Sequence, residues 1–87
     1  MIVYTIRIVD IVVDEDEPNV RETLYWSFNK GWAKEGENLP AIYPDLKAAQ
    51  KALKSTPSRA SKPIFTAEFW GWDTSKIEVV PFNFEEV

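Results

Sequence analysis

Side chains that commonly do chemistry are scarce in this chain of 87 residues, and two versatile types are missing. The sequence contains no histidine and no cysteine. This excludes the commonest base near neutral pH, thiolate nucleophiles, and zinc or iron–sulfur sites built on cysteine. The sequence also has no G-x-x-x-x-G-K loop that could hold a phosphate. We therefore expect no bound cofactor.

Serines and lysines gather between residues 54 and 62, where a serine–lysine nucleophile is conceivable. The residues concerned are Ser55, Ser58, Ser61, Lys54 and Lys62. This stretch is rich in Ser and Pro and nearly lacks apolar anchors, so it could not hold the fixed geometry that catalysis needs. The 14 acidic residues also form carboxylate pairs by chance, but so short a chain rarely encloses a substrate cleft. We expect a protein that is not an enzyme and has no catalytic residues.

A run of four carboxylates, Asp14, Glu15, Asp16 and Glu17, stands directly before Pro18. Carboxylate oxygens are ligands that Ca²⁺ prefers, but the run lacks the glycine and the terminal glutamate of an EF-hand loop. Neighbouring like charges and the proline oppose regular structure. We expect a solvated turn and no metal site; a Ca²⁺ or Mg²⁺ site, or an acidic docking loop, is the alternative.

Basic residues concentrate in the middle of the chain. Residues 1–43 carry four basic and eight acidic side chains, residues 68–87 carry one and five, and residues 44–67 carry five and one. The basic residues of the middle section are Lys47, Lys51, Lys54, Arg59 and Lys62. They could contact phosphates or an acidic protein surface. The alternative is an ordinary solvated lysine face, and the net charge of −4 opposes strong DNA binding.

Aromatic residues make up 14% of the chain, and their densest run lies at residues 64–72. Its β-branched and aromatic composition predicts a strand. The alternation of a strand then puts Phe65 and Phe69 on one face, and Trp70 and Trp72 on the other. We expect the two phenylalanines to lie in the core beneath a helix, and the two tryptophans to lie on an uncovered face of the sheet.

Exposed aromatics on a sheet can stack nucleic-acid bases or anchor a protein interface. Stacking platforms usually carry interleaved Lys or Arg, whereas residues 64–73 contain only Glu68 and Asp73 as charged residues. The sequence therefore favours a protein partner, with a second copy of the chain as one option. The predicted interface residues are Trp70, Trp72, Trp26, Trp32 and Glu68. The alternative is a second small core covered by loop 30–40.

The elements that must position these residues follow from hydrophobic pattern and turn residues. We expect strands at residues 2–13, 21–29, 64–72 and 77–82, a short edge strand at 39–43, and a helix at about 45–54 that Asp45 begins. Asp10 should mark a bulge in the first strand. Residues 20–30 also fit a helix, since Asn19 and Glu22 could form a capping box. Residues 31–40 should form a turn and a polar loop.

These elements predict an α+β fold in a single domain of residues 1–87. Its small antiparallel sheet has four to five strands, with one α-helix packed on one face, in the order β-β-(β)-α-β-β. Pro81 argues that the last strand is at an edge or ends there. The helix can cover only one face of such a sheet, so the second face must meet water, loops or another molecule.

Two segments resemble known proteins. The pattern Ile42–Ala49, in which a strand ending in an aromatic runs into a capped helix after hairpin strands, is similar to the layout of small phage-encoded accessory proteins. The segment Trp26–Gly31 is similar to the start of WGR modules, which bind nucleic acid. Ser27 and Phe28 stand where that motif has Gly-Arg, so we transfer no functional residue from it.

The sequence has no stretch of 18 apolar residues and no basic region before its first apolar run. It therefore predicts neither a membrane span nor a cleavable signal peptide. The absence of cysteine suits a reducing compartment. We expect a cytoplasmic binding module that engages a protein partner, such as a phage or mobile-element accessory or inhibitor; a nucleic-acid-associated module that uses the basic residues is the alternative.

Overall fold

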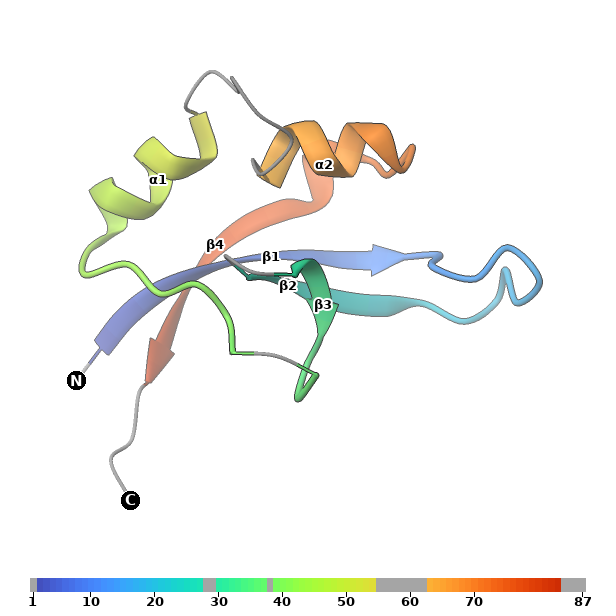
Figure 1. Ribbon diagram of the computed structural model, residues 1–87, viewed down its shortest axis with the longest axis horizontal. Helices are drawn as coiled ribbons and strands as arrows, with labels where there is room; N and C mark the ends of the chain where they lie inside the picture. Colours follow the sequence, from blue (N-terminus) through green and yellow to red (C-terminus); the bar gives the residue numbers. More distant parts are fainter. Residues whose placement is uncertain (1, 28–29, 38, 55–62, 84–87) are drawn as a thin grey trace.

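A computed structural model describes residues 2–27, 30–37, 39–54 and 63–83, which form a four-stranded antiparallel sheet and two short α-helices (Figure 1). The elements are β1 (Ile2–Ile11), β2 (Glu22–Ser27), β3 (Gly31–Lys34), α1 (Leu46–Lys54), α2 (Pro63–Phe69), the 3₁₀ turn η1 (Thr74–Lys76) and β4 (Ile77–Asn83). The strand order is β3-β2-β1-β4. The α+β class and the antiparallel sheet predicted from the sequence are confirmed.

Strand β1 lies inside the sheet because both of its faces are apolar enough to be covered. Thr5, Ile6 and Ile8 are fully buried. The register with β2 shifts between Ile8 and Ile11, and Asp10 has a positive φ of 53°. This bulge, predicted at Asp10, returns Ile11 to the face of Ile8. As a result, both isoleucines join one hydrophobic cluster.

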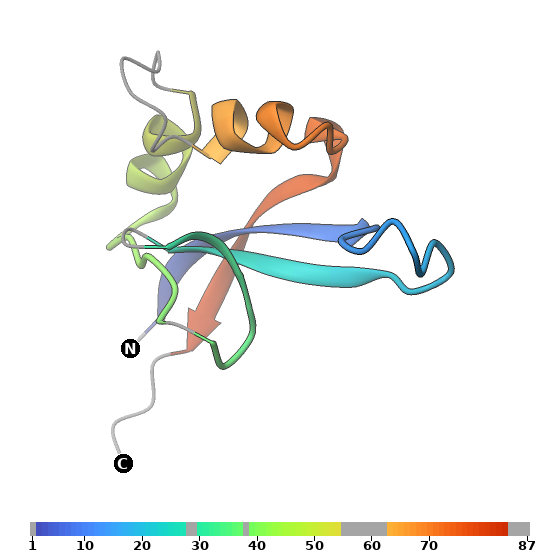
Figure 2. The ribbon, with the colours of Figure 1, turned by 45° about the vertical axis from the view of Figure 1, so that its right-hand side comes forward.

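Both helices lie on the same side of the sheet (Figure 2). Beneath them, one cluster gathers Ile8, Ile11 and Leu24 with Ala67 of α2. A second cluster contains Ile6, Trp26 and Ala41, against which Leu53 and other partly buried residues pack. The main apolar core therefore fills the single layer between the sheet and the helices.

Helix α1 begins where the sequence indicates. Asp45 accepts a hydrogen bond from the backbone N–H of Ala48 (2.7 Å) and its carbonyl accepts one from Ala49 (3.2 Å), which makes it the N-cap. The buried residue Ala49 and the partly buried Leu53 face the sheet. Leu46, at the first position of the helix, is exposed.

The predicted strand at residues 64–72 is wrong, because the chain forms α2 and a turn there. Pro63 occupies the first helical position, where its fixed φ and missing N–H cost nothing. At the other end, Gly71 has a φ of 77°. Its N–H donates to the Glu68 carbonyl, and the N–H of Trp72 donates to the Ala67 carbonyl, both at 3.0 Å. These paired bonds form a Schellman motif that closes the helix.

The fourth strand of the sheet comes from an unexpected place. Residues 31–40 were predicted as a turn and a polar loop, but Gly31–Lys34 pairs with β2 as strand β3. Gly31, the first residue of β3, adopts a φ of 71°, a conformation that glycine accommodates without strain. The predicted short strand at 39–43 reduces to one isolated bridge between Tyr43 and Tyr4. Pro40 has no N–H to donate to a ladder, which limits pairing in this segment.

Two further predictions about strands are confirmed. Residues 20–30 contain a strand rather than a helix, although β2 covers only Glu22–Ser27. Strand β4 is an edge of the sheet and pairs with β1 alone. Pro81 lies opposite Tyr4 within β4, and a proline is tolerated there because an edge strand needs donors on one side only.

Candidate functional site

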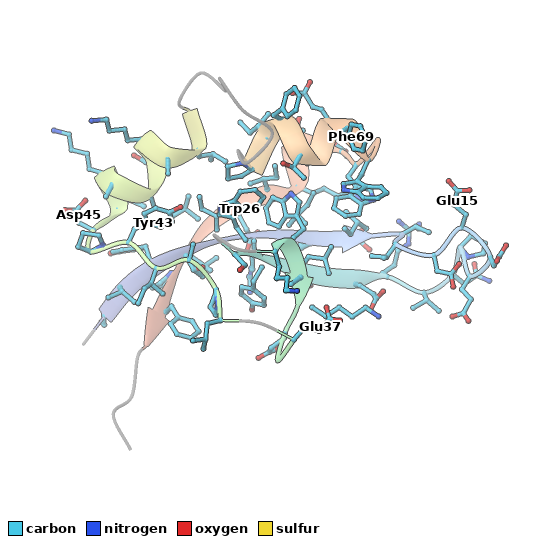
Figure 3. The ribbon with its side chains drawn as sticks, in the orientation of Figure 1. Glu15, Trp26, Glu37, Tyr43, Asp45 and Phe69 are labelled. Carbon is cyan, nitrogen blue, oxygen red and sulfur yellow. The ribbon has the colours of Figure 1, made fainter. Side chains whose placement is uncertain are left out.

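Four aromatic residues belong to α2 and the turn after it, and we call them the aromatic patch: Phe65, Phe69, Trp70 and Trp72. Phe69 is 75% exposed and Trp70 is 61% exposed. The rings of Phe69 and Trp70 meet edge to face with centroids 5.6 Å apart, and those of Trp70 and Trp72 stack at 6.0 Å. Figure 3 shows Phe69 at the end of α2 that is distant from α1. The patch therefore presents ordered aromatic rings to solvent.

The helix itself determines which residues the patch contains. Pro63 and Ala67 are the buried residues of α2 and lie four positions apart, on the stripe that faces the sheet. Phe65 and Phe69 are also four positions apart, but on the outer side of α2, where both are exposed. The prediction that these phenylalanines lie in the core is therefore wrong. It assumed a strand, whereas in the helix both side chains lie on the side that faces away from the sheet.

Trp72 connects the patch to the core. Its ring packs against the cluster of Ile8, Ile11, Leu24 and Ala67, and it is only partly exposed. The turn at Gly71 makes this possible because it folds the chain back toward the sheet directly after Trp70. The prediction that Trp72 lies on a face opposite the helix is wrong: it lies on the side that the helices cover. The stacking of Trp70 on Trp72 therefore joins an exposed ring to one that packs on the core.

Carboxylates border the aromatic patch. Glu68 and Asp73 are both exposed. Asp73 accepts hydrogen bonds from the hydroxyl (2.6 Å) and the backbone N–H (3.0 Å) of Ser75, which lower its pKa, with a smaller contribution from Lys76. The Nζ of Lys76 donates to the Asp10 carbonyl at 2.8 Å and is 3.5 Å from its carboxylate. The border of the patch is therefore acidic.

The other two tryptophans predicted for the interface lie elsewhere. Trp26 is 3% exposed, inside the core. Trp32 is half-buried, meets Trp26 edge to face at 5.3 Å, and donates from Nε1 to the Pro63 carbonyl at 3.3 Å. This pair holds β3 and the start of α2 together. The structure thus groups Trp70, Trp72 and Glu68 of the predicted interface, and separates Trp26 and Trp32 from them.

The predicted basic surface is described only in part. Lys47 and Lys51 are exposed on α1. Among the residues that the structure describes, neither lysine forms an ion pair. For Lys54 only the helical backbone is described, and Arg59 and Lys62 lie outside the described residues.

The acidic run behaves as a solvated turn. Asp14, Glu15, Asp16 and Glu17 are all exposed, at the tip of the hairpin between β1 and β2 (Figure 3). The carboxylate of Asp14 accepts from the Asp16 N–H at 2.9 Å, and its carbonyl accepts from the Glu17 N–H at 3.0 Å. Within the described part of the chain, no group of three or more acidic side chains is placed to hold a metal ion.

Sequence reasoning missed Phe65 and Phe69 as surface residues, although a signal for the helix was present. Gly71 follows Pro63 by eight positions, which puts proline just inside the start and glycine just past the end of a helix. The aromatic and β-branched composition of residues 64–72 outweighed this signal.

No described helix is long and apolar enough to cross a membrane. Comparisons with protein-family models, with curated proteins and with solved structures find no match to this chain.

Proposed function

We propose that this chain is a non-enzymatic binding module that engages a protein partner through the aromatic patch. The observation that supports the proposal is the exposure of Phe69 and Trp70 in ring contact with each other and with the anchored Trp72. Aromatic side chains held rigidly at the surface lose little entropy on binding and often supply most of the energy of an interface. The partner would offer an apolar groove to these rings.

The charge around the patch supports a protein rather than a nucleic acid. Glu68 and Asp73 border the rings, and the neighbouring Lys76 is already engaged by Asp10. Phosphates would be repelled by these carboxylates, whereas a groove with lysine or arginine at its rim would complement them. We therefore infer a partner whose binding groove is apolar at its centre and basic at its border.

The same carboxylates argue against a second copy of the chain as the main partner. In a symmetric dimer the same patch meets itself. Glu68 and Asp73 of one copy would then lie near those of the other, and like charges at an interface cost binding energy. The module is accordingly proposed to be monomeric when free. We also propose a cytoplasmic location, and an accessory or inhibitor role would suit so small a module.

Site-specific crosslinking tests the proposal. p-Benzoylphenylalanine placed at position 69 should crosslink the module to a specific protein in an extract of the source cells. The same label at position 46 is the control, since Leu46 is also exposed and apolar but lies on α1. Trp70→Ala should abolish the crosslink at position 69, and added salt should weaken it. Equal products at both positions, or products unaffected by Trp70→Ala, would contradict the proposal.

A nucleic-acid-associated module is the second candidate, favoured by the exposure of Lys47 and Lys51 on α1. The two lysines are one turn of α1 apart, and their charges could contact phosphates. Fluorescence anisotropy with labelled single-stranded and duplex oligonucleotides at low salt tests this candidate. Binding that weakens steeply with salt and is lost in Lys51→Glu would support it, and no binding at low salt would eliminate it.

A further inference from the structure

A pocket lies on the side of the sheet that the helices leave uncovered. Its volume is about 460 Å³, within the range typical of small-ligand sites. Its walls come from three parts of the chain and include Tyr25, Phe82, Leu39, Pro40, Glu35 and Glu37. Figure 3 shows Glu37 on the far side of the sheet from Phe69. The pocket is therefore separate from the aromatic patch.

Strand register explains why Tyr25 and Phe82 share this face. Tyr25 of β2 pairs with Arg7 of β1, and Phe82 of β4 pairs with Val3 of β1. Arg7 and Val3 are four residues apart, so their side chains and those of their partners point to the same side. Thr5 lies between Val3 and Arg7 on β1, and its hydroxyl donates to the Ala41 carbonyl at 2.8 Å. This buried bond holds the segment of Leu39 and Pro40 against the sheet.

Two carboxylates stand at the rim of the pocket, on either side of a tight turn. Gly36 has a φ of 87°, and the Glu37 N–H donates to the Lys34 carbonyl at 3.0 Å. Glu37 also accepts a hydrogen bond from the Lys34 N–H at 2.7 Å, which fixes its orientation. Within the described residues, Glu35 has no hydrogen bond or ion pair. The rim thus carries two negative charges.

The described basic side chains Arg7 and Lys34 are already paired with carboxylates. Arg7 lies next to Tyr25, and its guanidinium contacts the Glu78 carboxylate at 2.5 and 2.6 Å. Hydrogen bonds to Tyr25 and to Glu78 raise the pKa of Arg7. Lys34 pairs with Glu22 at 3.2 Å. A ligand in the pocket would therefore meet two aromatic walls and an uncompensated acidic rim.

We propose that this pocket binds an organic cation: an ammonium or guanidinium group carried on an apolar body. Aromatic ring faces attract cations, more strongly where water is excluded. Leu39 and Pro40 would pack against the apolar body, and the carboxylates of Glu35 and Glu37 would lie near the positive charge. An anion would be repelled by the same rim. Either a free amine or a Lys or Arg side chain of a peptide has this chemistry.

The test uses three probes of nearly the same shape and different charge, titrated into the ¹⁵N-labelled protein: phenethylammonium, 2-phenylethanol and phenylacetate. The backbone amides of Glu35, Gly36, Glu37, Leu39 and Ala41 report on the pocket. The cation should bind about tenfold more tightly than the neutral alcohol, the ratio that about 1.4 kcal/mol of charge recognition gives. Phenylacetate should not bind. A fourth probe, acetyl-Gly-Arg-Gly-amide, distinguishes a peptide side chain from a free amine as the tighter ligand.

The double variant Glu35→Gln/Glu37→Gln should reduce the tenfold preference for the cation to about twofold. Both side chains are exposed and glutamine keeps an acceptor for the Lys34 N–H, so the fold should be retained. Trp70→Ala is the control and should leave the binding of every probe unchanged. Equal affinity for cation and alcohol, binding of phenylacetate, or no shift at these amides would each overturn the proposal. None of these results bears on the aromatic patch.

Discussion

Two pairs of tryptophans differ in how far they are buried in this molecule. Trp26 and Trp32 lie between the sheet and the helices, where Trp26 is 3% exposed. Trp70 and Trp72 follow α2, and Trp70 is 61% exposed. Each pair makes a direct ring contact, at 5.3 and 6.0 Å. The residue types are the same, so composition does not distinguish a core pair from a surface pair. What differs is whether a neighbouring element covers the rings.

The comparison also separates stability from binding. In a chain of 87 residues without disulfides, large buried rings supply much of the apolar area that the small core needs. The first pair therefore serves the fold. In the second pair Trp70 removes little surface from water, whereas Trp72 packs against the core. Four substitutions test this division, beginning with the one that should affect stability most.

Trp26→Ala should lower the free energy of unfolding by about 3–5 kcal/mol, because it leaves a cavity beneath the helices. Urea denaturation followed by circular dichroism measures the loss. If the alanine variant does not fold, Trp26→Phe keeps a ring in place and should cost less. A loss below about 1 kcal/mol in Trp26→Ala would show that the buried pair does not support the fold, and the comparison would fail.

Trp72→Ala should have an intermediate effect of about 2 kcal/mol, because only part of the ring is buried against Ile8, Ile11 and Leu24. It should also weaken partner binding, since the stacked ring of Trp70 loses its support. The same denaturation series and the crosslink at position 69 measure the two effects. An effect on stability as large as that of Trp26→Ala would place Trp72 with the core instead.

Gly71→Ala should cost about 1 kcal/mol, because an alanine is strained at the φ of 77° found here. No atom lies within 4 Å of the added Cβ, so the cost measures backbone conformation alone. Gly71→Asn is the matched control and should cost less, since asparagine tolerates this region better. Equal stability of the wild type and the alanine variant would mean that the closing turn of α2 does not need its left-handed residue.

Trp70→Ala should change stability by no more than about 0.5 kcal/mol, as is usual for exposed residues. Its effect on partner binding should exceed tenfold, the behaviour of an interface hot spot. Thermal unfolding and the crosslinking experiment give the two values. A large loss of stability would show that the stacked ring supports the fold, and the aromatic patch would lose its distinction from the buried pair.

The sequence was sufficient for the class of fold and for several elements. Alternating β-branched residues predicted β1, and Asp10 predicted its bulge. Asp45 predicted the start of α1, and Pro81 predicted that β4 lies at an edge. Each of these signals is local, because it depends on a cap, a breaker or a period that neighbouring residues set.

The sequence did not determine the position of the aromatic residues between 64 and 72. Read as a strand, these residues place Phe65 and Phe69 in the core and both tryptophans together on the other face. As a helix closed at Gly71, they place both phenylalanines outside, and Trp72 turns inward alone. The helix depends on tertiary contact as well as on the local signals of Pro63 and Gly71, since Ala67 of α2 packs against the sheet although the segment has high β-propensity.

The sequence by itself determined how many aromatic side chains the chain contains and which kinds of chemical site it cannot form. Because the chain has no histidine or cysteine, neither the predicted nor the observed arrangement of its elements could contain a cysteine- or histidine-based site. Only the tertiary structure decided which rings face water, because exposure depends on what packs against a residue and not on its type. The pocket is also a product of tertiary structure, since Tyr25, Glu37 and Phe82 come from distant parts of the chain.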